Sequence, residues 1–89
     1  MRYLLDTHVL LWLLGDPDSV PIDVQQTLAD RSNDALASAV SAMEVATKVR
    51  IGELDSARAL AAQAIEGNLV LVTTDSAFSD LNGLRTLGW

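Results

Sequence analysis

The N-terminal segment Arg2–Asp6 is a short apolar run that ends on a carboxylate, and it is the feature that most constrains the fold. The run predicts a buried strand, and the apolar spacing of the following residues, Thr7–Leu14, predicts a helix. A strand that passes directly into a helix is typical of an α/β sheet, whose ligands bind beyond the carboxyl ends of the strands. We therefore expect Asp6 at that edge, as one of several carboxylates that bind a divalent cation.

A second apolar run, Leu69–Thr74, is the clearest strand of the chain and is followed by Asp75. It is apolar on both faces, which is typical of a central parallel strand. Weaker patterns predict strands over Ala35–Ala39 and Leu84–Leu87. Because helical patterns separate these strands, the sequence predicts an α/β fold with a small open parallel sheet of about four strands flanked by helices.

The remaining apolar spacing predicts three more helices, over Pro21–Asp30, Ser41–Ile51 and Asp55–Glu66. Gly15 and Pro17 predict a turn over Gly15–Asp18, because glycine and proline end helices. A loop is predicted over Arg31–Asp34. The side chains expected to face the core on the first two helices are Val9, Leu10, Leu13 and Leu14, and Ile22, Val24 and Leu28.

The length of 89 residues predicts a single domain over 1–89 of modest stability, for which a partner or a second copy is expected. Hydrophobic residues make up 49% of the chain, which is enough for a core. The absence of cysteine excludes disulfides and thiolate metal sites and favours a cytoplasmic location. The apolar run Val9–Leu14 is too short to cross a bilayer, so no membrane association is expected.

The formal net charge of −6 means that bulk charge does not attract nucleic acid to this protein. Nucleic-acid binding would need a local basic patch or a bridging cation. A basic protein partner fits the charge balance more simply.

Three acids fall at the predicted carboxyl edge of the sheet by their spacing: Asp6, Glu44 and Asp75. Carboxylates held close together repel one another unless a cation neutralises them. Oxygen-only ligation suits a hard cation such as Mg²⁺ or Mn²⁺. A cation held in this way can orient a phosphate and activate a water for in-line attack on a phosphodiester.

Each acid also has a structural interpretation. Asp6 fits the N-cap of the first helix, Glu44 lies three residues after Ser41 in a capping-box pattern, and Asp75 fits a turn or the cap of a short helix through Phe78. These roles do not exclude metal binding, because a capping carboxylate keeps one oxygen free. The coincidence of three acids at one edge favours the metal site.

Several other residues are left with two interpretations. His8 is a general base or an exposed polar residue beside a helix start. Three basic residues either contact phosphate or lie on solvated helix faces: Lys48, Arg50 and Arg58. Trp12 and Trp89 are expected as core or interface anchors.

Three segments together resemble PIN-domain ribonucleases, specifically the VapC-type toxins of bacterial toxin–antitoxin pairs. Leu4–Trp12 resembles the opening of that family, and Ser41–Leu54 resembles its second motif, a helix that carries a catalytic glutamate. Ala61–Ala64 followed by Leu69–Asp75 resembles its C-terminal helix, strand and last acid. The resemblance follows the family order along nearly the whole chain.

The resemblance implies an endoribonuclease that depends on Mg²⁺ or Mn²⁺, is inhibited by a cognate antitoxin protein and forms a homodimer. Its RNA substrate would be cut at a site where Asp6, Glu44 and Asp75 are both the catalytic residues and the metal ligands. These three positions carry over from the family motifs directly.

One acid of the family pattern is missing. Counting back from Gln63, with Arg58 as the family arginine, puts Ala57 where an aspartate is expected, and Asp55 is the nearby candidate for its replacement. The chain is also shorter than the family pattern between Leu54 and Ala61, which implies a shortened PIN-like domain that lacks one edge strand.

Loss of a carboxylate removes charge and a ligand from a hard-cation site, so weak or absent cleavage is expected. The alternative function is a non-catalytic toxin-like module that binds an antitoxin or associates with itself.

Overall fold

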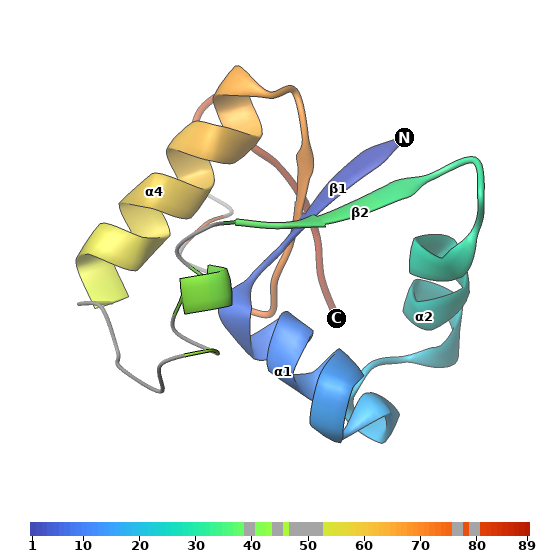
Figure 1. Ribbon diagram of the computed structural model, residues 1–89. Coiled ribbons are helices and arrows are strands. Elements are labelled where there is room, and N and C mark those ends of the chain that lie inside the picture. The colour runs from blue at the N-terminus through green and yellow to red at the C-terminus, as the bar shows by residue number, and fades with distance from the viewer. Residues whose placement is uncertain (39–40, 44–45, 47–52, 76–77, 79–80) are drawn as a thin grey trace.

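The computed structural model describes residues 1–38, 41–43, 46, 53–75, 78 and 81–89, and of residues 53–57 only the backbone. The strands that these residues form are β1 Arg2–Leu5, β2 Asp34–Ala37, β3 Val70–Val72 and β4 Arg85–Leu87. They pair in parallel in the order β2-β1-β3-β4 (Figure 1). The predicted α/β fold with a small open sheet of four parallel strands is confirmed, and it is consistent with a PIN-like arrangement.

Helices cover both faces of the sheet (Figure 1). The helical segments are α1 Thr7–Gly15, the 3-10 turn η1 Pro17–Ser19, α2 Ile22–Ala29 and α4 Glu53–Glu66, and residues 41–43 and 46 are helical as well. Helices α1 and α2 pack on one face and α4 on the other. In the part of the chain that the structure describes, no helix is both long and apolar enough to span a membrane.

Two apolar cores lie between these layers, because successive side chains of a strand point to opposite faces of the sheet. Leu4 and Leu71 are completely buried toward α4, while Leu5 and Val72 face α1 and α2. The α4 core consists of Leu4, Leu60, Ala61, Ala64, Leu69, Leu71 and Phe78. The core under α1 and α2 consists of Leu5, Val9, Val20, Val24 and Val72.

The order of the strands creates a topological switch point between β1 and β3. Strand β1 leads through α1 and α2 to β2 on one side of it, whereas β3 leads to β4 on the other side. The connections that leave these two neighbouring strands therefore diverge at their carboxyl ends. Ligands of open parallel sheets bind in the crevice that such a divergence leaves.

The boundaries of all four strands differ from the prediction by one or two residues. Strand β2 begins at Asp34 rather than Ala35, because the backbone N–H of Asp34 donates to the carbonyl oxygen of Met1 at 3.0 Å. Strand β3 ends at Val72. Asp75 therefore lies in the segment beyond the strand rather than directly at its end.

The predicted inward faces of the first two helices were wrong at one residue each. Leu14 and Ile22 are 69% and 67% exposed. At about 100° per residue, Leu14 lies about 140° around α1 from the buried Val9, and Ile22 lies about 160° around α2 from Val24. Both side chains therefore point away from the sheet.

A left-handed residue and an arginine hold the edge strand β4. Asn68 has a φ of 53°, a conformation that asparagine tolerates better than most residues. The Arg85 guanidinium donates through Nη2 to the carbonyl oxygen of Asn68 at 3.1 Å and to its Oδ1 at 2.9 Å. The turn before β3 is thus tied to the first residue of β4.

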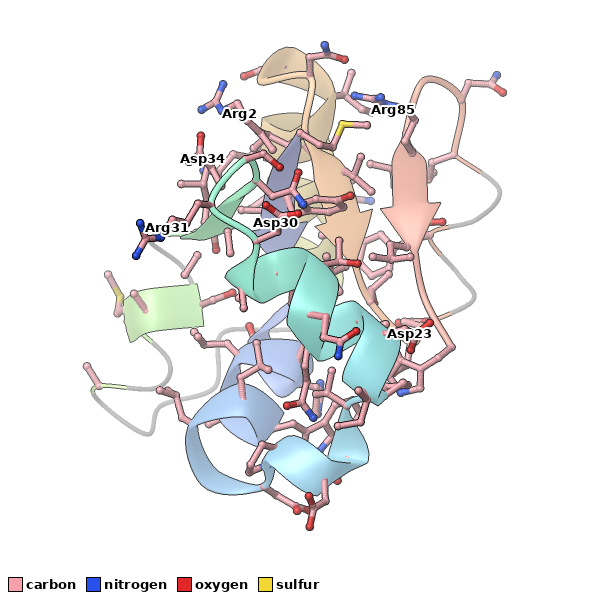
Figure 2. All side chains as sticks on the ribbon, turned by 90° about the vertical axis from the view of Figure 1, so that its right-hand side faces the viewer. Arg2, Asp23, Asp30, Arg31, Asp34 and Arg85 are labelled. Carbon is pink, nitrogen blue, oxygen red and sulfur yellow. The ribbon has the colours of Figure 1, made fainter. Side chains whose placement is uncertain are left out.

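The acids at the amino end of the sheet belong to a loop and a strand. Asp30 accepts hydrogen bonds from the backbone N–H and the hydroxyl of Ser32 at 2.9 and 2.8 Å, and these bonds hold the pKa of Asp30 below its usual 3.8. Figure 2 shows Asp30 and Asp34 at the same end of the molecule as Arg2 and Arg31. They lie at the opposite end of the strands from Asp6.

We expect Gly88→Ala to destabilise the protein. A Cβ at position 88 would lie 2.5 Å from the carbonyl oxygen of Thr73, which is backbone and cannot turn aside. Overpacking of this kind costs about 1–3 kcal/mol, measured as the free energy of unfolding in urea. Gly15→Ala is the matched control, because its Cβ would meet nothing within 4 Å. Unchanged stability of Gly88→Ala would contradict this close packing of the β4 end.

Candidate functional site

Asp6 joins the end of β1 to the start of α1. Its backbone N–H donates to the carbonyl oxygen of Val72 at 3.0 Å, and its own carbonyl oxygen accepts from Leu10 at 2.9 Å. With φ −62° and ψ 153° it is the N-cap of α1, and its side chain accepts from the N–H of His8 through Oδ1 at 3.3 Å. The capping role is therefore confirmed, and it engages one carboxylate oxygen.

The second oxygen of Asp6 binds a hydroxyl from the neighbouring strand. Thr73, 4% exposed and directly after β3, donates from Oγ1 to Asp6 Oδ2 at 2.6 Å. The same Oγ1 accepts from the backbone N–H of Asp75 at 3.1 Å. The structure thus brings Asp6 and the backbone of Asp75 to one edge of the sheet, with a single hydroxyl between them.

Asp75 itself is exposed and begins the turn toward Phe78. Its carbonyl oxygen accepts a backbone hydrogen bond from Phe78 at 3.3 Å, which matches the turn expected there. Asp75 therefore adds an exposed acid to the edge that holds the half-buried Asp6.

On the other side of β1, buried hydroxyls connect its end to the end of β2. Ser38 and Ser41 are at most 1% exposed, and the Ser38 hydroxyl donates to Ser41 Oγ at 3.1 Å. Ser41 Oγ also shares a 2.7 Å hydrogen bond with Thr7 Oγ1. The segment that carries Ser41 is therefore held against the first turn of α1, directly after Asp6.

The predicted capping box at Ser41 was wrong. Ser38 accepts the backbone N–H of Ser41 through its hydroxyl at 3.0 Å, and its carbonyl oxygen accepts from Ala42 at 2.9 Å. Ser38 is thus the cap, three residues earlier than expected, because it lies where the strand ends. Glu44, the second predicted acid, lies outside the described residues.

Asp55 and the position where the resemblance predicts an acid, residue 57, lie at the beginning of α4. Asp55 and Ala57 are in its first turns, and their side chains are outside what the structure describes. Because α4 returns the chain to the amino end of β3, it begins at the carboxyl edge of the sheet (Figure 1). Arg58 is exposed, and Lys48 and Arg50 fall outside the described part of the chain.

The donor atoms at this edge are oxygens, which suits a hard cation such as Mg²⁺ or Mn²⁺. They are the Asp6 carboxylate and the hydroxyls of Thr7, Ser38, Ser41 and Thr73. Among the described residues, no three His, Asp or Glu side chains form a group that could hold a metal ion. These oxygens suit such a cation chemically, and Asp6 is the described carboxylate among them.

Sequence reasoning missed the hydroxyl residues at this edge, of which Thr73 orients Asp6. Thr73, Ser38 and Thr7 directly follow or flank apolar strands. The signal is a hydroxyl residue at the position where a strand leaves the sheet, since a buried hydroxyl there needs a polar partner. In the described part of the chain, no buried side-chain nitrogen or oxygen lacks a hydrogen-bond partner.

Fold and site together define an open α/β protein with an acidic, hydroxyl-lined edge at its topological switch point. Comparison of the chain with protein-family models, with curated protein sequences and with solved structures found no match.

Replacing Thr73 with valine is expected to destabilise the protein by about 1.5–3 kcal/mol, the usual cost of losing a hydrogen bond to a charged group. Valine has nearly the same shape but leaves Asp6 Oδ2 and the Asp75 N–H without the hydroxyl. Thr73→Ser keeps the hydroxyl and is the control. Equal unfolding free energies for the valine and serine variants would contradict the role of the hydrogen bond.

Proposed function

We propose that this protein is a metal-dependent endoribonuclease of the PIN-domain, VapC toxin type. The motifs around Asp6, Glu44 and Asp75 support the family. The observation that carries the proposal is the hydrogen bond from Thr73 to Asp6 at the switch point, because it draws two of the three acid-bearing segments to one edge.

In the proposed site, Asp6, Glu44 and Asp75 hold one Mg²⁺ or Mn²⁺. When bound, the cation would polarise the phosphate and activate a water, which then deprotonates near neutral pH. The chain's own contribution is orientation. The N–H of His8 and the hydroxyl of Thr73 bind different oxygens of Asp6, so the carboxylate is fixed before a ligand arrives.

The proposed partners follow from the same family. An antitoxin protein would cover the acidic edge, a second copy would form a homodimer, and the toxin would act in the cytoplasm. The charge of −6 supports a basic partner surface.

The second candidate function is a toxin-like module that binds a partner without cutting RNA. Two observations favour it. Ala57 replaces an acid of the family pattern, and β2 is an edge strand with Asp34, Ala35 and Ala37 exposed. Such an edge can pair with a strand of an antitoxin or of a second copy.

Asp6→Asn tests the metal site. We expect it to weaken Mn²⁺ binding by at least roughly 100-fold in calorimetric titration, because even changes to residues behind the ligands cost 10–100-fold. Cleavage of a labelled RNA should disappear with it. Asp34→Asn is the matched control, since it removes the same charge at the opposite end of the sheet.

Two results separate the candidate functions. Mn²⁺ binding and RNA cleavage that both depend on Asp6 support the ribonuclease. Absence of Mn²⁺ binding by the native protein at millimolar metal supports the binding module and rejects the ribonuclease.

Ala57→Asp tests the missing acid. A restored carboxylate is expected to raise Mn²⁺ affinity roughly tenfold and to increase cleavage, because hard-cation affinity rises with ligand charge. Ala57→Asn is the control of equal size without the charge. Equal Mn²⁺ affinity of the two variants would contradict the assignment of position 57 to the site.

A further inference from the structure

Three aromatic side chains form a continuous surface beside the candidate site, here called the aromatic strip: His8, Trp12 and Trp89. The ring centroids of Trp12 and Trp89 lie 6.0 Å apart with planes tilted by 52°. Those of His8 and Trp12 lie 6.3 Å apart with a tilt of 48°. Both tryptophans of the chain are thus in one place.

A backbone hydrogen bond connects each end of the aromatic strip to the Asp6–Thr73 pair. His8 donates its backbone N–H to Asp6. At the other end, Thr73 donates its backbone N–H to Leu87 at 3.0 Å, and Gly88 lies against the carbonyl oxygen of Thr73. This contact brings Trp89 onto α1, and Figure 1 shows the C-terminus beside that helix.

The exposure of the aromatic strip is graded. Trp12 is half-buried and packs against the core under α1 and α2, whereas His8 is exposed and Trp89 is 42% exposed. The other described aromatic side chains lie in the cores, Phe78 under α4 and Tyr3 against the opposite face. An aliphatic residue would cover Trp12 equally well, so the exposed ring of Trp89 calls for another explanation.

We propose that the aromatic strip is a stacking platform for an unpaired nucleobase of a single-stranded RNA, next to the phosphate that Asp6 would address. The choice of RNA rests on the proposed function. Aromatic rings stack on every base, and stacking needs no positive charge. This suits a protein of net charge −6 in which three of the six basic residues, Arg2, Arg31 and Arg85, lie at the other end of the strands.

Binding of a labelled oligouridylate, followed by fluorescence anisotropy in EDTA and high salt, tests the platform without cleavage and with charge repulsion screened. We expect Trp89→Leu to weaken binding roughly 5- to 100-fold, which is the usual effect of removing one stacking ring. Trp89→Phe should retain most of the affinity. Urea unfolding of both variants checks that leucine still covers Trp12.

Ile65→Ala is the matched surface control, because Ile65 is 44% exposed on α4, the helix on the other face of the sheet. It should bind the oligomer as the native protein does. An oligodeoxyuridylate should bind as tightly as the ribose form, since the platform contacts bases. Binding restricted to the ribose oligomer would assign recognition to the 2′-hydroxyl and overturn the platform.

Two further outcomes overturn the inference: no binding of the oligomer by the native protein, or equal affinity of Trp89→Leu and Trp89→Phe. Two other results distinguish a failure of the aromatic strip as an RNA platform from a failure of the proposed ribonuclease function. If RNA binding depends on Trp89 but no cleavage occurs with Mn²⁺, the platform stands and the ribonuclease does not. If cleavage depends on Asp6 while Trp89→Leu binds normally, the reverse holds.

Discussion

The hydrogen bond from Thr73 Oγ1 to Asp6 Oδ2 joins residues 67 positions apart, at the ends of the two central strands. At 2.6 Å it has the length of a charge-assisted bond, which is about twice as strong as a neutral one. The same threonine holds the Asp75 segment through its hydroxyl and the end of β4 through its backbone N–H. The acidic edge and the aromatic strip at the switch point are therefore both connected through this one residue.

The bond orients Asp6 without neutralising it. In the described part of the chain, its two side-chain donors are an N–H and a hydroxyl, both uncharged. The buried hydroxyls of Ser38 and Ser41 beyond Thr7 are uncharged as well. A further carboxylate brought to this edge raises the repulsion, and only a cation relieves it. The proposed metal is therefore supported by the oxygen donors already in position and by the uncharged donors to Asp6 among the described residues.

Much of the fold follows from patterns that depend on a few residues. The runs Arg2–Asp6 and Leu69–Thr74 predict a buried strand and a central strand, and the structure has β1 and β3 at the centre of the sheet. Leu14 and Ile22 were misassigned because their apolar type outweighed their spacing, which puts them on the far side of each helix from Val9 and Val24. The roles of Thr73 and Trp89 depend on contacts between distant parts of the chain, and no local pattern encodes those contacts.

If the crossover before β3 is shortened, as the family resemblance implies, this affects the proposed chemistry more than the scaffold. Helix α4 has 14 residues and is about 21 Å long, whereas a strand of three or four residues spans only about 10–13 Å. One helix is therefore long enough to return the chain from the carboxyl edge to the amino end of β3. Asp6 and Thr73 lie on the central pair of strands, so their geometry does not need a longer connection. What a shorter connection removes is a ligand, and a site that keeps its orienting hydrogen bonds but has fewer carboxylates binds its cation more weakly before it loses its shape.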